Sequence, residues 1–436
     1  MGDRDKPYIN LCNYDFLVYS PLNLLIKSIC MRKLSTILLL VLFGMQQIMA
    51  GGYQVRLQGQ KQTGIGLIGT PFAYGASSIF YNPGNLTFMK ENYSFSGGIS
   101  PIFSNALYRA SNSDYEARTS NPTGTPFYFY AAGKVDEDLA VGVGVYTPFG
   151  SSVKWDEDWN GRYLIQEISL QTIFIQPTLS YRINDNFGIG AGLSIATGSV
   201  DLTRALPSPI NGQFNMSGNT TALGFNVGIY LKPTEKLSIG VDYRSKMNMK
   251  IENGDTKFTD IPQALAANFP ASGNFNAELP LPANLDAGIA WDISEKFTLA
   301  AEVNYVFWSA YDSLIIDFKV NNELLADSRN PRSYKNSLIW RLGGEYRIND
   351  WMTARAGIYY DPTPTDENYF TPETVSLNTL AFTFGLSVKP AKGLSIDLSY
   401  LQLNGLEDER NYQPDNFGGT YVARTYIPGI GVSYNF

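Results

Sequence analysis

The chain has 436 residues and a formal net charge of −7, and only 17% of its residues are charged. It contains no histidine, which rules out a Ser–His catalytic triad, and an acidic chain without basic clusters gives no support for nucleic-acid binding. Its 40 glycines, 28 tyrosines and 25 phenylalanines suit a membrane β-barrel, where small residues line the lumen and aromatic residues form interfacial girdles.

Residues 31–50 read as a signal peptide. Arg32 and Lys33 precede an apolar core of about ten residues, and Ala50 supplies a small residue at the cleavage point. The core is too short to span a bilayer as a helix, which takes about 20 apolar residues. Because this signal peptide begins 30 residues into the chain, we expect Met31 to be the true start and residues 1–30 to be an upstream start extension that is absent from the mature protein. A buried apolar strand or helix is the alternative.

Both cysteines, Cys12 and Cys30, precede the predicted cleavage point. The mature chain would then lack thiols as well as histidines, so we expect no disulfide, no metal site and no cofactor. We expect no enzymatic activity either.

Residues 51–90 form a segment of different character. The stretch 63–86 is rich in glycine and apolar side chains but does not alternate. Irregular backbone at membrane depth must be buried in protein or in an aqueous lumen. We therefore expect an N-terminal hatch that plugs the lumen of a barrel formed by residues 91–436. A periplasmic tail is the alternative.

One type of short turn recurs between runs of alternating residues. Asn, Asp, Pro and Gly favour such reversals, and about 40 to 60 residues separate successive turns, enough for two strands and a loop. Tight turns at one end and long loops at the other describe an outer-membrane barrel. The turns are Lys134–Leu139, Arg182–Phe187, Lys232–Leu237, Asp292–Phe297, Arg347–Met352 and Lys389–Leu394.

The alternating runs predict an all-β fold, a transmembrane antiparallel β-barrel of about 14 strands. A soluble β-sandwich would also alternate, but the last run ends on the aromatic Phe436, which resembles the signal read by the barrel-assembly machinery. The runs lie near 92–104, 125–134, 139–147, 168–183, 187–203, 220–232, 237–251, 282–293, 297–318, 336–348, 352–360, 378–389, 394–404 and 423–436. The connections are expected to be extracellular loops, near 105–124, 148–167, 204–219, 252–281, 319–335, 361–377 and 405–422.

The sequence resembles the FadL/TodX family of outer-membrane transporters for long-chain fatty acids and hydrocarbons. The resemblance covers residues 51–436. It rests on motifs in a matching order: Asn82-Pro83-Gly84, Tyr146–Gly150 followed by Trp155, Trp159 and Gly161–Tyr163, Leu279–Pro282, Trp308-Ser309 and Tyr360–Pro362. The family's hatch motif has alanine where this chain has Gly84, so the packing of the hatch is open.

The resemblance implies a mechanism. Ligand would enter among the extracellular loops, bind in the barrel and leave sideways into the membrane when the hatch moves and a kink in the third strand opens. Gly142, Gly144 and Pro148 are the candidates for that kink, because glycine and proline weaken a strand ladder. Gly142 and Gly144 could equally serve as small lumen residues.

Alternation directs several charged side chains into the lumen. Arg244, Arg341 and Arg355 could hold a ligand carboxylate bidentately. They could also simply pair with acids on the same strands, which alternation directs inward too: Asp242, Asp286, Glu302, Glu345 and Asp397.

The sequence thus predicts passive uptake of a hydrophobic small molecule, a fatty acid or hydrocarbon, through a hatch-plugged barrel with lateral release. An aqueous porin for small polar solutes and a surface adhesin or receptor are the alternatives. We expect a monomer in the outer membrane of a Gram-negative bacterium, in contact with membrane lipid and lipopolysaccharide. We expect no nucleic-acid partner.

Overall fold

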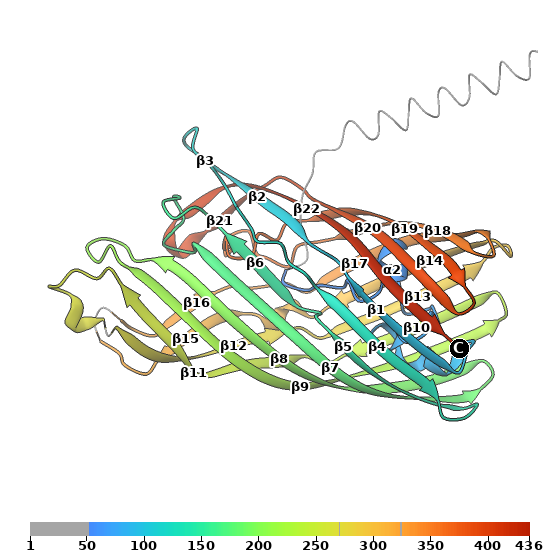
Figure 1. Ribbon diagram of the computed structural model, residues 1–436. Helices are drawn as coiled ribbons and strands as arrows, with labels where there is room; N and C mark the ends of the chain where they lie inside the picture. Colours follow the sequence, from blue (N-terminus) through green and yellow to red (C-terminus); the bar gives the residue numbers. More distant parts are fainter. Residues whose placement is uncertain (1–51, 270, 323–324) are drawn as a thin grey trace, which may run out of the picture. The chain divides into compact units, whose positions relative to one another are not determined.

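The computed structural model describes residues 52–269, 271–322 and 325–436. The predicted extension 1–30 and signal peptide 31–50, with Cys12 and Cys30, lie outside the described residues. Within the described ranges, no helix is both long and apolar enough to cross a membrane. Those ranges form an all-β, closed antiparallel barrel of 14 strands (Figure 1), so the predicted fold class is confirmed.

Several barrel strands consist of two segments. In chain order the barrel strands are β1 (Tyr93–Ile99) with β2 (Phe103–Ala110); β3 (Glu116–Arg118) with β4 (Phe127–Lys134); β5 (Leu139–Tyr146) with β6 (Gly150–Lys154); β7 (Glu167–Asn184); β8 (Phe187–Ala205); β9 (Gln213–Thr234); β10 (Leu237–Arg244) with β11 (Met247–Thr259); β12 (Ser272–Leu281) with β13 (Asn284–Asp292); β14 (Phe297–Val306) with β15 (Ser313–Phe318); β16 (Ser328–Pro331) with β17 (Ser337–Asn349); β18 (Met352–Asp361); β19 (Thr379–Ala391); β20 (Leu394–Gly405) with β21 (Asp408–Tyr412); and β22 (Phe417–Asn435).

Pairing of the first strand with the last closes the barrel. β1 runs antiparallel to β22, with Ser94 opposite Asn435 and Ile99 opposite Ile430. The C-terminus lies at the end of the barrel that carries the short turns (Figure 1). Each predicted turn connects two neighbouring strands, so all of the turn predictions are confirmed.

Alternation along the strands separates an outer apolar surface from the lumen. From Gln171 to Tyr181 in β7, exposed and buried residues alternate without a break. Leu179 and Leu193 are about half exposed on the outer face, whereas Gln176 and Ser194 are fully buried inside. Apolar side chains that a soluble protein would bury thus face outward, as expected of a wall that meets lipid.

The predicted loops were too long. The loop expected at 204–219 shortens because β9 begins at Gln213, and the one expected at 252–281 contains the end of β11 and all of β12. Beyond the apolar band the outer residues need not be apolar, so alternation fades while the hydrogen-bonded ladder continues. Short 3₁₀ turns lie outside the ladder: η2 (Ala266–Asn268), η3 (Trp308–Ala310) and η4 (Gln413–Asp415).

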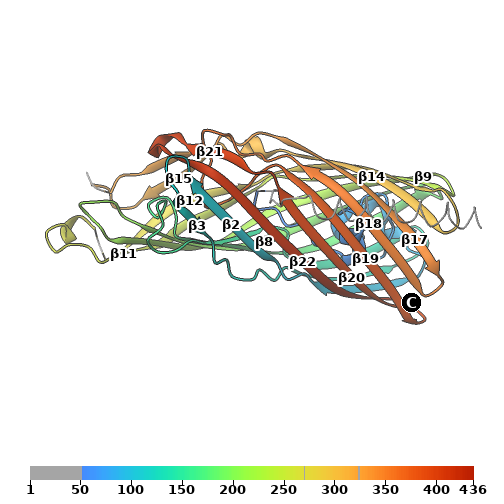
Figure 2. The ribbon, with the colours of Figure 1, turned by 90° about the horizontal axis from the view of Figure 1, so that it is seen from above.

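Residues 52–89 lie within the barrel and are mostly buried (Figures 1 and 2). They contain α2 (Gln60–Gly64), α3 (Ser78–Tyr81) and the 3₁₀ helix η1 (Pro83–Phe88). α2 contacts β18, β19, β20 and β22, whereas η1 contacts β5, β7, β8, β9 and β10. The N-terminal segment, as residues 52–89 are called below, therefore touches the wall on several sides.

Glycines on the inner wall let the N-terminal segment approach closely. A Cβ added at Gly190 or Gly228 would collide with Pro83, and one at Gly240 would collide with the carbonyl group of Thr70. Further wall glycines meet the segment in the same way: Gly288, Gly343, Gly357 and Gly385. Each of the strands β8, β9, β10, β13, β17, β18 and β19 thus carries at least one such glycine.

Candidate functional site

Each of the first three strands of the wall is interrupted, as are several later strands. β1 and β2 are separated at 100–102, β3 and β4 at 119–126, and β5 and β6 at 147–149. Proline stands in each gap, at Pro101, Pro122, Pro126 and Pro148, where it cannot donate a hydrogen bond to a ladder.

In the third strand the break falls at Pro148 and not at the two predicted glycines. Gly142 and Gly144 lie in the regular part of β5 and keep their register with β4 and β7. Their small size has another use, because Ile79 of the N-terminal segment packs against both positions.

The N-terminal segment bonds directly to this break. Gln54 forms an antiparallel bridge with Phe149, Val55 N donates to Pro148 O (2.7 Å) and Gly150 N donates to Tyr53 O (2.9 Å). Gln58 Nε2 also donates to Thr147 O (2.9 Å). Residues 53–58 therefore occupy the place where the third strand lacks regular pairing.

A cavity of about 470 Å³, called the chamber below, adjoins the break. Its lining includes lumen residues such as Leu401 and Ile427, residues 121–126 of the second break, Thr147 and Phe149 of the third break, and residues 150–153 of β6. Phe127 and Ile173 line it too, although these residues are 37% and 39% exposed and alternation places their side chains on the outer face. The chamber thus reaches the wall at two residues whose side chains face outward.

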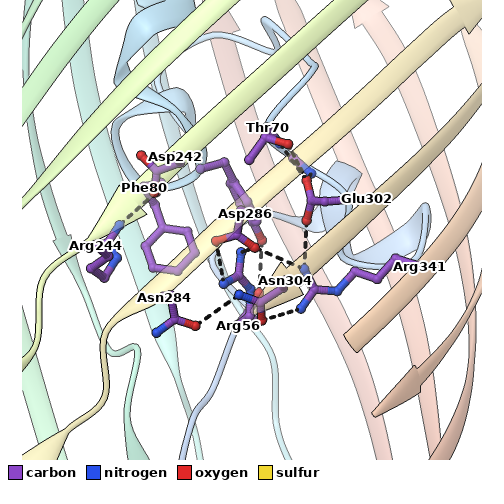
Figure 3. A network of polar contacts seen from close by, with 12 residues as sticks. Arg56, Thr70, Phe80, Asp242, Arg244, Asn284, Asp286, Glu302, Asn304 and Arg341 are labelled. Carbon is purple, nitrogen blue, oxygen red and sulfur yellow. Dashed lines mark hydrogen bonds and ion pairs between the residues drawn. The ribbon is translucent and has the colours of Figure 1, made fainter. Parts of the chain in front are cut away.

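A buried charge network joins the N-terminal segment to the wall (Figure 3), and its two arginines, Arg56 and Arg341, line the chamber. Arg56 binds Asp286 of β13 through both terminal nitrogens, at 3.0 and 3.1 Å. Arg341 of β17 lies 2.7 Å from Glu302 of β14 and 3.4 Å from Asp286. Glu302 also accepts hydrogen bonds from the backbone of Gly69 and Thr70. Two cations and two anions therefore balance in this network.

The other two predicted arginines also lie in the lumen, apart from Arg341. Arg355 binds Glu345 (2.6 Å) and donates to Ser387 (2.6 Å). Arg244 donates to Tyr146, Gln176 and the carbonyl oxygen of Phe80, and it forms no ion pair among the described residues. Neither residue lines the chamber.

The predicted hatch motif, Asn82 to Gly84, lies against β9. Asn82 Nδ2 donates to Thr70 O and Ile229 O, each at 2.9 Å, and Asn82 Oδ1 accepts from Gly84 N (2.9 Å) at the start of η1. A Cβ added at Gly84 would lie 2.7 Å from the carbonyl oxygen of Gly228. Glycine at this position therefore matches the short distance between the segment and the wall.

Apolar residues dominate the extracellular part of the lumen. Trp155 and Trp159 stack with their ring centroids 4.2 Å apart. A smaller pocket of about 80 Å³, lined by Leu170, Met216 and Met249 among others, shares Leu170 with the chamber. Apolar surface therefore continues from the extracellular part into the chamber.

Ion pairs among the loops lie beside this apolar surface. Arg332 and Glu373 are 2.6 Å apart and buried. At the exposed rim, the hydrogen bond from Lys335 (2.7 Å) holds the pKa of Asp366 below its usual range.

Sequence reasoning missed Asp361 as a lumen residue. It was read as the start of a loop, but it ends β18 and lies on the same face as Arg355 and Tyr359. Its side chain lines the chamber. Extending the alternation by one residue would have placed it inside. Among the described residues, no group of three or more His, Cys, Asp or Glu could hold a metal ion.

A family model described as outer membrane protein transport protein (OMPP1/FadL/TodX) matches residues 41–436. The chain belongs to this family. Members of the FadL/TodX family are outer-membrane β-barrels, and the closed barrel with its apolar outer face agrees, so the predicted outer-membrane location is confirmed.

Two relatives show the range of the family. The long-chain fatty acid transport protein of Salmonella typhi is 21% identical over 411 residues, which is 87% of this chain and 91% of that protein. Outer membrane protein P1 of Haemophilus influenzae is 22% identical over 353 residues, covering 70% of this chain and 74% of that protein.

Solved structures share the fold. A Pseudomonas aeruginosa FadL homologue superposes with a TM-score of 0.74 at 19% identity, covering 90% of this chain and 100% of the other. The Pseudomonas putida toluene transporter TodX gives 0.72 at 17% identity, covering 89% and 99%.

Proposed function

We propose that this FadL/TodX-family barrel carries hydrophobic compounds passively across the outer membrane, and that the compounds leave sideways through the break in the first three strands. The observation that carries the proposal is the chamber, whose lining runs from lumen residues to the outward-facing Phe127 and Ile173. The names of the relatives support the same class of cargo, fatty acids and aromatic hydrocarbons.

A lateral path suits an apolar cargo. Burying a methylene group is worth roughly 0.8 kcal/mol, so a long alkyl chain would lose several kcal/mol by crossing a water-filled pore. A path from an apolar chamber to the bilayer avoids that loss. The aqueous porin, our earlier alternative, would instead need an open lumen, which the N-terminal segment occupies.

The N-terminal segment acts as the hatch in this proposal. Residues 53–58 bond to the break in the third strand, so a small displacement of these residues would widen the lateral opening. The rest of the segment would stay packed against the wall glycines and bonded to the charge network.

A reversible clamp tests the proposal. Gln54→Cys with Phe149→Cys joins the segment to the break, because bridge partners lie within disulfide range. Leu237→Cys with Trp291→Cys joins β10 to β13 where the two strands pair without a gap, away from the N-terminal segment's contact with the third strand, and serves as the control. Uptake of a radiolabelled hydrocarbon into cells should be lost in the oxidised clamp, return on reduction and stay normal in the control.

Uptake at the native rate by the oxidised clamp would contradict the proposed exit. Lack of uptake by the native protein for fatty acids and hydrocarbons alike would contradict the transport function itself.

A further inference from the structure

The charges around the chamber do not balance. Of the described residues that line it, the charged ones are Arg56, Arg341 and Asp361. Asp286 and Glu302 neutralise the two arginines at distances of 2.7 to 3.1 Å. Asp361 is left over.

Asp361 has the features of a ligand-binding group. Its residue is only 9% exposed, and its side chain faces the lumen from the end of β18. It makes no hydrogen bond or ion pair with any described residue, although Arg56 and Arg341 lie close enough to interact with it electrostatically. A buried carboxyl group without a hydrogen-bond partner is costly, and a bound donor would remove that cost.

The same arrangement disfavours an anionic ligand. A carboxylate that entered the chamber would meet Asp361 and would find terminal nitrogens of both arginines bonded to acids. The Nε atoms of both arginines have no partner among the described residues, but they are buried. The remaining predicted arginines offer no substitute, because Arg244 and Arg355 do not line the chamber. Two carboxyl groups brought together out of water cannot both stay ionised without a large cost, because the low dielectric does not screen their repulsion, so one of them would have to take up a proton.

The rest of the lining fits a neutral, largely apolar molecule. Trp308, Phe149, Leu401 and Ile427 supply apolar surface, and a volume of about 470 Å³ suits a small organic ligand. Neutral polar side chains such as Gln54 and Asn121 line the chamber as well, but Asp361 is the one anionic acceptor among its described lining residues and would orient a donor on such a molecule.

We propose that the chamber selects uncharged hydrophobic compounds bearing a hydroxyl group, such as alkylphenols and alcohols, which donate to Asp361, and that it discriminates against carboxylates of the same size. This inference rests on the proposed function and names the chemical class that the site prefers.

Matched ligands test the preference. Binding of 4-butylphenol and 4-butylbenzoate to the purified barrel is measured by isothermal titration at neutral pH, with butylbenzene as the apolar reference. The native protein should bind the phenol about tenfold or more tighter than the benzoate, and tighter than butylbenzene. Liposome uptake of the same compounds should follow the same order.

Substitution of Asp361 tests the cause. Asp361→Asn removes the negative charge at nearly constant volume, and Asp361→Ser is a second variant in case the first folds poorly. Both should strengthen benzoate binding several-fold and reduce the phenol-to-benzoate ratio. Asp312→Asn removes an exposed loop carboxylate instead and should leave the ratio unchanged.

Two results would overturn the inference while leaving transport intact: tighter binding of benzoate than of phenol by the native barrel, or an unchanged ratio in folded Asp361 variants. Failure of the native barrel to bind or carry any of the three compounds would overturn the proposed function and this inference together.

Discussion

The barrel wall has two sectors that hold the N-terminal segment differently. From β7 to β20 the strand parts next to the short turns pair without a gap, although breaks farther from the turns divide several of these strands, and this part of the wall is called the continuous sector below. The segment lies there against glycines and is held by two largely buried ion pairs: Arg56 with Asp286, and Lys61 with Asp397. In the sector from β1 to β6 the strands are interrupted, and the segment meets the break of the third strand mainly through backbone hydrogen bonds to 147–150.

The difference suggests which part moves. Separating a buried ion pair leaves an unpaired charge and costs several kcal/mol, whereas one backbone hydrogen bond contributes about 1 kcal/mol net. Displacing residues 53–58 is therefore far easier than expelling the whole segment. We infer that the continuous sector anchors the hatch and that the interrupted sector opens.

The largest effect is expected from a change on the continuous sector. Gly240→Val should force the segment away from β10, because even a Cβ collides with the carbonyl group of Thr70. Planar-bilayer recordings should show little current for the native barrel and a steady conductance for the variant. Gly97→Val is the control, since a Cβ there meets its nearest neighbour at an ordinary 3.5 Å. If the Gly240→Val barrel shows as little current as the native barrel, the contact between Gly240 and Thr70 does not hold the segment in the lumen.

Breaking the anchoring charge network should mainly reduce stability. Asp286→Ala leaves Arg56 buried without its acid and should lower the free energy of unfolding by about 3–5 kcal/mol in urea titrations of the folded barrel. Asp312→Ala, which removes an exposed partner of Arg329, should cost about 1 kcal/mol or less. Equal losses in the free energy of unfolding for the two variants would contradict the view that the ion pair of Arg56 and Asp286 anchors the segment.

The smallest change in stability is expected at the interrupted sector. Gln58→Leu removes the hydrogen bond to Thr147 O, but it also removes a buried Oε1 that has no partner among the described residues. The free energy of unfolding should therefore change by about 1 kcal/mol or less, while uptake changes several-fold. A loss of stability as large as that of Asp286→Ala would contradict the view that residues 53–58 are bound only weakly to the interrupted sector.

Local patterns predicted most of the barrel. Turn residues such as Asn184 and Asp185 located the short reversals, and the alternation of lipid-facing and lumen-facing residues located the strands. Strand ends on the extracellular side were predicted less well, because the outer residues there no longer need to be apolar. Asp361 was read as loop for that reason.

The site depended on contacts that no local pattern reveals. Arg56 meets Asp286 across 230 positions of the chain, and Arg341 meets Glu302 only because β14 pairs with β17. The sequence left two possibilities for the lumen arginines, a ligand clamp or pairing with acids. The structure pairs Arg341 and Arg355 with acids and surrounds Arg244 with neutral acceptors.

Photocrosslinking tests lateral exit most directly. A hydrophobic ligand carrying a diazirine is added to the barrel in lipid nanodiscs, and the adducts are located by mass spectrometry. We expect adducts inside the chamber, at Leu401 or Ile427, and at its outer rim, at Phe127 or Ile173, with none at Leu193 on the continuous outer wall beyond the level set by free ligand in lipid. Adducts confined to the lumen and the short periplasmic turns would contradict the account.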